Sequence, residues 1–98
     1  MKNVSTTEER LLNALQGTRN DMRLSRESAA AICGGDRQAR ETIHQLRLKG
    51  YVICSDSRIG GYYFADTPAD AKKFLAETDS RIKELMAMKE AVIDGVLS

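Results

Sequence analysis

Six polar side chains near the start of one predicted helix have the chemistry to bind nucleic-acid bases. The apolar positions Ala39, Ile43 and Leu46 fall at helical spacing and define the inner face of this helix. The outer face near its start carries Arg37, Gln38, Arg40, Glu41, His44 and Gln45. Arginine can pair bidentately with guanine and glutamine with adenine, so these residue types suit base edges in the major groove. The alternative is an ordinary solvated face, and Glu41 would repel phosphates unless it accepts from a cytosine or pairs with Arg37.

Further arginines lie where backbone contacts to the same nucleic acid would be made. Arg58 is predicted near the tip of a hairpin loop and suits the phosphate backbone or the minor groove. Arg26, with Arg19 and Arg23, surrounds the start of the preceding helix and is a candidate for backbone contacts. A solvated loop arginine explains Arg58 nearly as well.

No constellation of residues in the sequence predicts catalysis or metal binding. His44 is the only histidine, and no set of carboxylates or cysteines stands at ligand spacing around it, so we interpret it as a surface polar residue. Cys33 and Cys54 are interpreted as small buried or half-buried hydrophobic residues. The glycines at 34–35 lack the lysine and the spacing of a phosphate-binding loop, and those at 60–61 belong to a hairpin. We therefore expect no enzyme, no metal and no cofactor.

The elements that must position these residues begin with a short helix. It is predicted to start at one of the capping residues 5–7 and to end near Gly17. Asn20-Asp21 predicts a turn, and the alternation of apolar and polar residues at 22–24 predicts a very short strand.

Residues 25–50 are predicted to form two helices joined by a glycine turn. Ser25 starts the first of them, which stops at the glycines 34–35. Asp36 is expected to cap the second, Leu48 to be one of its apolar positions, and Gly50 to close it. Helix, short turn, helix is the layout of a helix-turn-helix unit.

A hairpin and a long helix complete the predicted elements. The β-rich runs 51–55 and 61–65 are joined by a short glycine-bearing loop, which is a hairpin signal. Thr67 as a cap, followed by Pro68, starts a last helix that continues to about residue 97. About 30 residues at ~1.5 Å each extend about 45 Å, which exceeds the roughly 30 Å diameter of a small domain.

An apolar stripe runs along this last helix beyond the reach of its own domain. Its members that we predict to form a dimer interface are Leu75, Ile82, Leu85, Met86, Val92, Ile93 and Val96. A heptad pattern with polar interruptions at Thr78 and Lys89 is fitted by the positions Ala71, Leu75, Thr78, Ile82, Leu85, Lys89, Val92 and Val96. We favour a homodimer held by this coiled coil, because most oligomers are symmetric dimers. The alternative is that the helix folds back over the first helix.

Length and composition fit one soluble domain. The chain has 98 residues, 42% of them hydrophobic and 30% charged, with no low-complexity tract. The net charge is +1, but residues 1–50 hold nine basic against six acidic side chains, and residues 66–98 hold five against seven. No apolar run has the length of a membrane span, and the N-terminus lacks the apolar stretch of a signal peptide, so we expect a cytoplasmic protein.

The order of these elements resembles a winged helix-turn-helix domain. The resemblance is carried by SRESAAAICGGDRQARETIHQLRLKGYVI, above all by IHQLRLKGYVI, which is similar to the helix end, glycine and first wing strand of winged-helix DNA-binding proteins. The run GYYFADTPADAKKFLAETDSRIKELM is similar to its continuation in small winged-helix proteins of bacteriophages and prophages. Together the two matches cover residues 5–97. The double glycine at 34–35 departs from the single glycine more often found in such turns.

The resemblance and the residues together give one set of expectations. We expect an α+β fold, mainly α, with a winged helix-turn-helix domain at 5–66 and a long C-terminal dimerisation helix at 67–97. The expected function is non-enzymatic binding of double-stranded DNA as a homodimer, in transcription regulation or as a phage or prophage replication or recombination accessory factor. We expect neither a membrane nor a small-molecule substrate as a partner. The alternative is a winged-helix protein–protein interaction module, a phage-encoded adaptor or inhibitor, that does not bind DNA.

Overall fold

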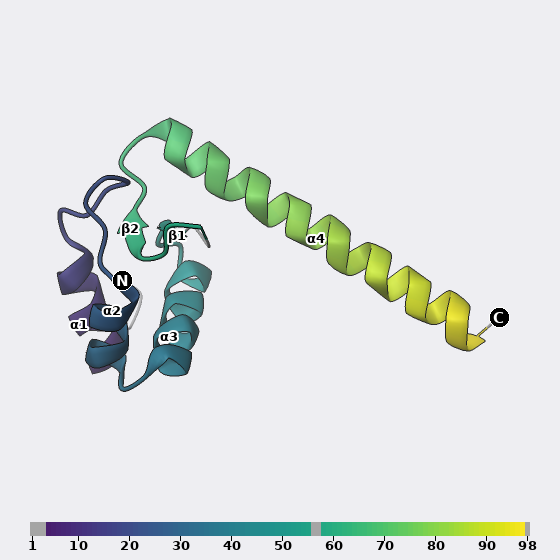
Figure 1. Ribbon diagram of the computed structural model, residues 1–98, viewed down its shortest axis with the longest axis horizontal. Helices are drawn as coiled ribbons and strands as arrows, with labels where there is room; N and C mark the ends of the chain where they lie inside the picture. Colours follow the sequence, from purple (N-terminus) through teal and green to yellow (C-terminus); the bar gives the residue numbers. More distant parts are fainter. Residues whose placement is uncertain (1–3, 56–57, 98) are drawn as a thin grey trace.

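The computed structural model describes residues 4–55 and 58–97 and is mainly helical. Its elements follow the order α1 (Thr6–Leu15), α2 (Arg26–Cys33), α3 (Asp36–Leu48), β1 (Ile53–Ser55), β2 (Tyr62–Phe64) and α4 (Pro68–Leu97). The first three helices and the two strands gather into one body, from which α4 projects (Figure 1). These elements confirm the expected α+β class with mainly helical content.

The first helix begins at a reciprocal capping box. The Ser5 hydroxyl accepts from the Glu8 backbone N–H at 3.1 Å, and the Glu8 carboxylate accepts from the Ser5 N–H at 3.1 Å. Glu8 is also buried, and its Oε2 lies 2.6 Å from the Lys49 ammonium at the far end of α3. One side chain therefore starts α1 and ties it to the end of a helix 41 residues away.

The turn between α2 and α3 requires both of its glycines. Ser25 caps α2 as predicted, accepting from the Ser28 N–H at 3.1 Å. Gly34 and Gly35 have φ angles of 91° and 148°, values that residues with a Cβ rarely adopt. The prediction that Asp36 caps α3 is wrong: the cap position is Gly35, and Asp36 is the first helical residue.

The end of α3 explains the run LRLKGY, residues 46–51, within the segment that carries the resemblance. Gly50, at φ 99°, donates to the Arg47 carbonyl at 3.0 Å, and Tyr51 donates to the Leu46 carbonyl at 3.1 Å, which is the Schellman arrangement. Tyr51 then packs against the core that contains Leu46. Leu48, the further apolar position near the end of the helix, lies on the outer side of α3 and is 69% exposed.

The two strands form the predicted antiparallel hairpin. Ile53 pairs with Phe64, Cys54 with Tyr63, and Ser55 with Tyr62. The very short strand expected at 22–24 is reduced to isolated bridges. Met22 bridges to Arg19 within the turn, and Leu24 and Tyr62 exchange two backbone hydrogen bonds of 2.8 Å. The Leu24–Tyr62 bridge places the segment before α2 along the open edge of β2.

A single hydrophobic core holds the helices against the hairpin. Its fully buried members are large aliphatic or small side chains from α1, α2, α3 and β1, joined by one tyrosine of β2. They are Leu11, Leu15, Ala29, Ala39, Ile43, Leu46, Ile53 and Tyr62. Cys54 is buried and Cys33 is half-buried, as predicted for small hydrophobic residues.

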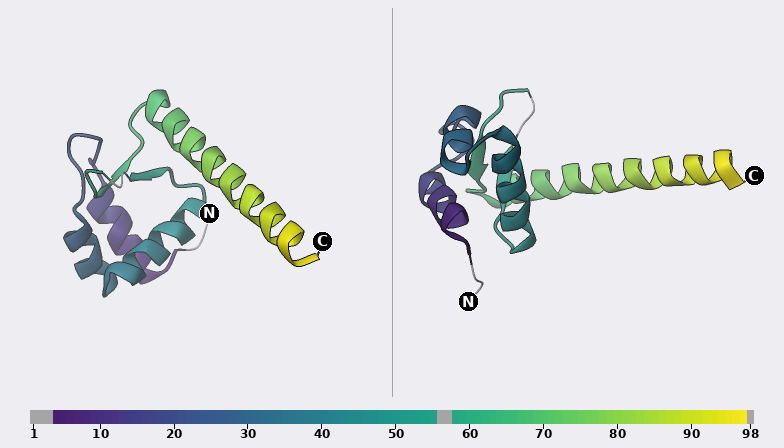
Figure 2. Two further views of the ribbon diagram at one scale, coloured as in Figure 1. Left: turned by 45° about the vertical axis from the view of Figure 1, so that its right-hand side comes forward. Right: turned by 90° about the horizontal axis from the view of Figure 1, so that it is seen from below.

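The last helix is capped as predicted and then leaves the domain. Thr67 Oγ1 accepts from the Asp70 N–H at 3.2 Å, and the Asp70 carboxylate accepts from the Asp66 N–H at 3.1 Å. α4 has 30 residues and gives the molecule a longest dimension of 51 Å. Its positions 75–96 are all exposed, and it points away from the body instead of folding back over α1 (Figures 1 and 2). None of the described helices combines the length and the apolarity that a membrane crossing requires.

Candidate nucleic-acid interface

The outer face of α3 presents to solvent the six side chains that the sequence predicts to contact bases. Arg37, Gln38, Arg40, Glu41, His44 and Gln45 are all exposed, while Ala39, Ile43 and Leu46 are buried on the opposite side. Helical geometry places Arg37, Glu41 and His44 nearest the centre of the outer face, with Gln38 and Arg40 on its two flanks. The structure therefore brings these six residues together on one helix surface.

Two of the six side chains already interact with their own helix start. Arg40 Nε lies 3.2 Å from the Asp36 carboxylate, an ion pair across one turn of the exposed surface. The Gln38 side chain folds back over Gly35, so closely that a Cβ on Gly35 would overlap its amide oxygen. Arg37 forms no ion pair with any residue that the structure describes. Of the two arginines on this face, Arg37 is therefore the one that no carboxylate of the described residues offsets.

A second group of arginines surrounds an open hollow between the start of α2 and the hairpin loop. The hollow has a volume of about 450 Å³. It is lined by Arg23, Ser25, Arg26, Glu27, Arg58, Ile59, Gly60 and Gly61. A Cβ on Gly60 would stand 3.7 Å from Arg26 Nε, so the Arg26 guanidinium lies directly against the loop. The predicted residues Arg26 and Arg58, 32 positions apart in the sequence, thus line one hollow.

Arg23 holds the loop in place, a role that the sequence did not predict. Its guanidinium donates to the Gly60 carbonyl at 3.1 Å and to the Asn20 carbonyl at 2.8 Å. The same group lies 4.7 Å from the centre of the Tyr63 ring, within cation–π range. These contacts of Arg23 hold the loop beside the segment that precedes α2.

The loop crosses the segment before α2 at Gly61, where only a glycine fits. A Cβ at this position would lie 2.9 Å from the Leu24 carbonyl oxygen and 3.2 Å from Arg23 Cβ. The Leu24 oxygen accepts from Tyr62, so this close approach is part of the bridge that joins the segment to β2. The hollow therefore depends on backbone contact at this crossing.

Arg47 is a second missed residue, because its charge faces the interior. It donates from Nε to the Ile53 carbonyl at 2.9 Å and from a terminal nitrogen to Ser55 Oγ at 3.2 Å. Its guanidinium carbon is 5.1 Å from the centre of the Phe74 ring. Burial lowers the pKa of Arg47. It follows Ile43 by one helical turn, and this spacing is the sequence signal that would have placed it on the inner side of α3.

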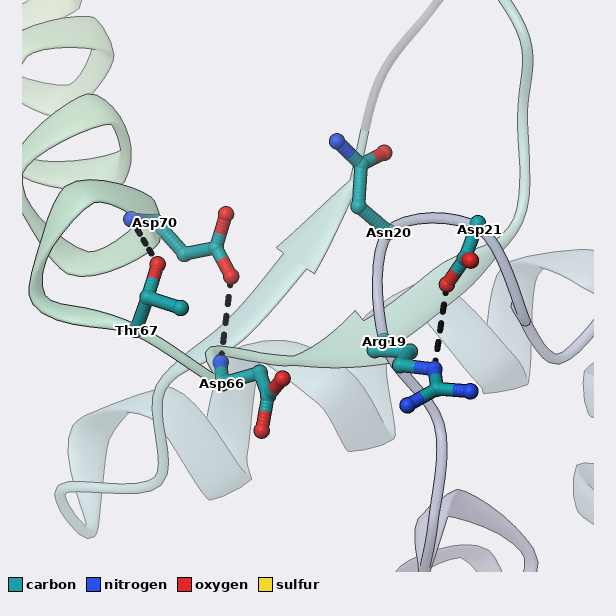
Figure 3. A pocket seen from close by; sticks show the side chains of 6 residues that line it. All are labelled: Arg19, Asn20, Asp21, Asp66, Thr67 and Asp70. Carbon is teal, nitrogen blue, oxygen red and sulfur yellow. Dashed lines mark hydrogen bonds and ion pairs between the residues drawn. The ribbon is translucent and has the colours of Figure 1, made fainter.

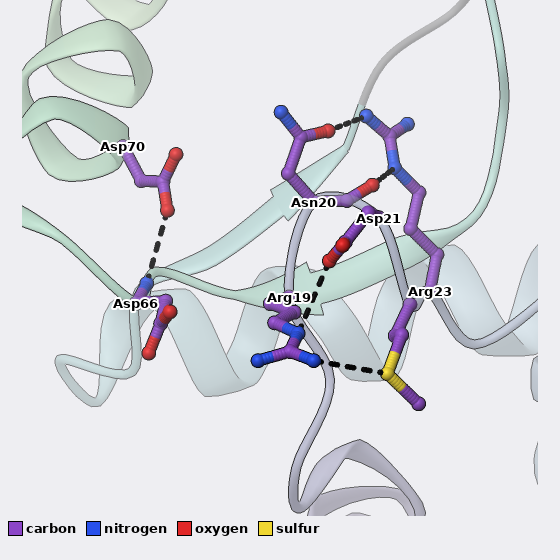
Figure 4. A network of polar contacts seen from close by, with 7 residues as sticks. Arg19, Asn20, Asp21, Arg23, Asp66 and Asp70 are labelled. Atoms are coloured by element: carbon purple, nitrogen blue, oxygen red, sulfur yellow. Dashed lines mark hydrogen bonds and ion pairs between the residues drawn. The ribbon is translucent and has the colours of Figure 1, made fainter.

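A separate open hollow lies where α4 begins (Figure 3). Its volume is about 480 Å³, and it is lined by Arg19, Asn20, Asp21, Asp66, Thr67 and Asp70. Arg19 Nε pairs with the Asp21 carboxylate at 3.1 Å, and a terminal nitrogen of Arg19 lies 3.5 Å from the sulfur of Met22 (Figure 4). Arg19 is therefore partly neutralised and belongs to a structural turn, not to the arginine-lined hollow.

Two further titratable side chains of the body, Cys54 and Tyr63, are buried in the hairpin. Burial raises the pKa of the Cys54 thiol and of the Tyr63 phenol, so both stay protonated at neutral pH. Within residues 4–55 and 58–97, no three His, Cys, Asp or Glu side chains gather closely enough to hold a metal ion. No protein-family model, no curated protein sequence and no solved structure matches this chain.

Proposed function

We propose that this protein is a winged helix-turn-helix protein that binds double-stranded DNA as a homodimer. The element order supports this assignment: α1, the bridged segment at Leu24, α2, a glycine turn, α3 and then a hairpin. In this interpretation α3 is the recognition helix and the loop between β1 and β2 is the wing. The biological setting we propose is transcription regulation, or replication or recombination, in a phage or prophage.

The observation that carries the proposal is the placement of exposed arginines at the start of α3 and around the hollow beside α2. Arg37 heads the exposed face of α3 with no carboxylate partner in the described chain, and Arg26 and Arg58 line the hollow beside α2. A recognition helix places its N-terminal residues on base edges while neighbouring elements hold the backbone. Arg37 would then read bases, and Arg26 and Arg58 would contact phosphates.

Dimerisation is the second part of the proposal and rests on α4. The apolar side chains that we predict to pair, from Leu75 to Val96, are between 42% and 73% exposed in the single chain. Exposed apolar stripes of this length mark sites of association. A two-fold dimer would favour inverted repeats as binding sites.

One observation favours a second candidate, a protein–protein interaction module. Leu48 lies on the same outer side of α3 as Glu41 and is largely exposed, and Arg40 is offset by Asp36. An exposed apolar residue among side chains of both charges suits contact with a protein better than contact with a row of phosphates. In that case α3 would be the docking surface and DNA would not bind at low salt.

Fluorescence anisotropy of a labelled mixed-sequence duplex, titrated at two salt concentrations, distinguishes the two candidates. DNA binding predicts an affinity that falls steeply with salt, because each phosphate contact releases counterions. Arg37→Ala, Arg26→Ala and Arg58→Ala should each weaken binding, and loss of either proposed backbone contact should also reduce the salt slope by about one. Arg10→Ala is the matched control, since Arg10 is an exposed arginine on α1 and belongs neither to α3 nor to the lining of the hollow.

Two outcomes of this titration would contradict the proposal. If the wild-type protein shows no binding at low salt, the interaction module becomes the better account of α3. If it binds but all the variants bind as well as Arg10→Ala, the DNA lies on another surface and the recognition-helix assignment is wrong.

A further inference from the structure

We infer that α4 pairs with α4 of a second copy in an antiparallel orientation, with Leu85 of each chain facing Ile82 of the other. This inference rests on the proposed homodimer and specifies its geometry. The exposed stripe is covered by a second copy of this chain, because the order of its residues is symmetric and its charges are complementary in the antiparallel pair.

The stripe is exposed in the described chain from Leu75 to Val96. Only the first turns of α4 touch the body, where Cys54 lies near the Asp70 carbonyl and Arg47 lies on Phe74. Residues 71–96 span nearly four heptads, the length over which a coiled-coil pattern becomes informative. Along the centre of the stripe, alternating four and three residues apart, lie Ala71, Leu75, Thr78, Ile82, Leu85, Lys89, Val92 and Val96.

The order of these eight positions is symmetric about a point between Ile82 and Leu85. Reversing one helix places Leu85 opposite Ile82, Thr78 opposite Lys89, Leu75 opposite Val92, and Ala71 opposite Val96. The two polar interruptions therefore meet each other, and every other layer is apolar on both sides. A stripe with polar positions at two unrelated places would bury at least one of them against an aliphatic side chain.

The parallel orientation makes each position face its own copy. It brings the two Lys89 ammonium groups together between the Leu85 and Val92 layers, where like charges repel. In the antiparallel register Lys89 instead lies beside Thr78 and Asp79 of the second copy, and its ammonium can reach a carboxylate of opposite charge. Charge complementarity therefore favours the antiparallel pair.

The contacts of Thr78 fit a position inside such an interface. Its hydroxyl donates to the Phe74 carbonyl of its own helix at 2.9 Å. The hydroxyl hydrogen already has an acceptor in its own helix, so burial of Thr78 in the interface leaves no donor without a hydrogen bond. The antiparallel pair would carry the two α1–β2 bodies at opposite ends of the paired helices.

Cysteine cross-linking on the full chain tests the orientation. In the antiparallel register Leu75 faces Val92 of the second copy, so neither Leu75→Cys nor Val92→Cys forms a disulfide dimer alone under mild oxidation. An equimolar mixture of the two variants, after exchange of subunits, should give the cross-linked heterodimer. The wild-type chain is the control for Cys33 and Cys54.

Efficient cross-linking of Leu75→Cys or Val92→Cys alone would show parallel helices and overturn the inference, while the proposed homodimer would stand. A wild-type mass of one chain in light scattering would instead remove the dimer itself, and the DNA titration would still report on DNA binding.

A charge reversal supplies an independent test. Asp79→Lys should raise the dissociation constant of the dimer about tenfold, because two symmetric pairs with Lys89 are lost and each is worth a few-fold. Glu84→Lys, with the same charge change on the opposite side of α4, should leave it unchanged. Equal effects of the two variants would contradict the antiparallel register.

Discussion

Gly60 and Gly61 provide a matched pair of substitutions that tests how the hairpin loop is held. Both residues have a φ of 82°, so alanine at either position carries the same backbone strain, about 1 kcal/mol. They differ in what a Cβ would meet. At Gly60 the nearest atom is Arg26 Nε at 3.7 Å, an ordinary contact, whereas at Gly61 it is the Leu24 carbonyl oxygen at 2.9 Å.

The difference in free energy follows from the Leu24–Tyr62 bridge. To make room for the methyl group that Gly61→Ala introduces, the Leu24 carbonyl must move away from the loop, and this disturbs two backbone hydrogen bonds of 2.8 Å with Tyr62. Each such bond contributes about 1 kcal/mol net. We expect Gly60→Ala to cost about 1 kcal/mol of unfolding free energy and Gly61→Ala about 2–4 kcal/mol.

Urea denaturation at one fixed protein concentration measures both values, because the stability of a dimer depends on concentration. The expected order of the denaturation midpoints places Gly61→Ala well below Gly60→Ala, and Gly60→Ala slightly below wild type. If the two variants were equally stable, the close crossing at Gly61 would not exist and the position of the loop beside α2 would be wrong.

Three further outcomes are expected. Glu8→Gln keeps the capping box but loses the ion pair with Lys49, which should cost about 1–2 kcal/mol at neutral pH. The hydrogen bond from Lys49 lowers the pKa of Glu8 below its ordinary 4.5. The stabilisation by the ion pair is therefore complete above pH 4.5 and is lost as the pH falls through the lowered value. Denaturation at pH 7 and at pH 3 should show the difference in unfolding free energy between Glu8→Gln and wild type shrinking at the lower pH. Replacing Ile82 and Leu85 with lysine should yield monomers in light scattering, and an unchanged mass would refute the dimer helix. Arg47→Met, which retains the aliphatic stem but leaves the Ile53 carbonyl without its donor, should cost about 1–3 kcal/mol in thermal denaturation without changing the α3 surface.

Most element boundaries were predictable because their signals are local. Ser5, Ser25 and Thr67 cap their helices with hydrogen bonds to residues three positions away, and those interactions are written in the sequence. Gly50 closes α3 through its own left-handed backbone. The wrong prediction at Asp36 has the same origin, since an aspartate before a helix is a good cap unless a preceding glycine already occupies the cap position.

The outer face of α3 was predictable and the arginine-lined hollow only in part. Helical periodicity alone separates Arg37 from Ile43, so the exposed face follows from the sequence. Leu48 is apolar, but helical periodicity assigns it to the outer side of α3, and the structure shows it exposed there. That Arg26 and Arg58 share one hollow depends on where the loop returns, which no local signal specifies.

The sequence by itself determined the helices, the hairpin and the symmetric stripe of α4, because each arises from interactions within a few residues or from a repeated spacing. Only the tertiary structure decided that Arg23 contacts the Gly60 carbonyl, that Arg47 contacts the Ile53 carbonyl and that Glu8 meets Lys49. These contacts join residues whose distance in space is fixed by the packing of the whole core, and their energies depend on burial that a linear pattern does not contain.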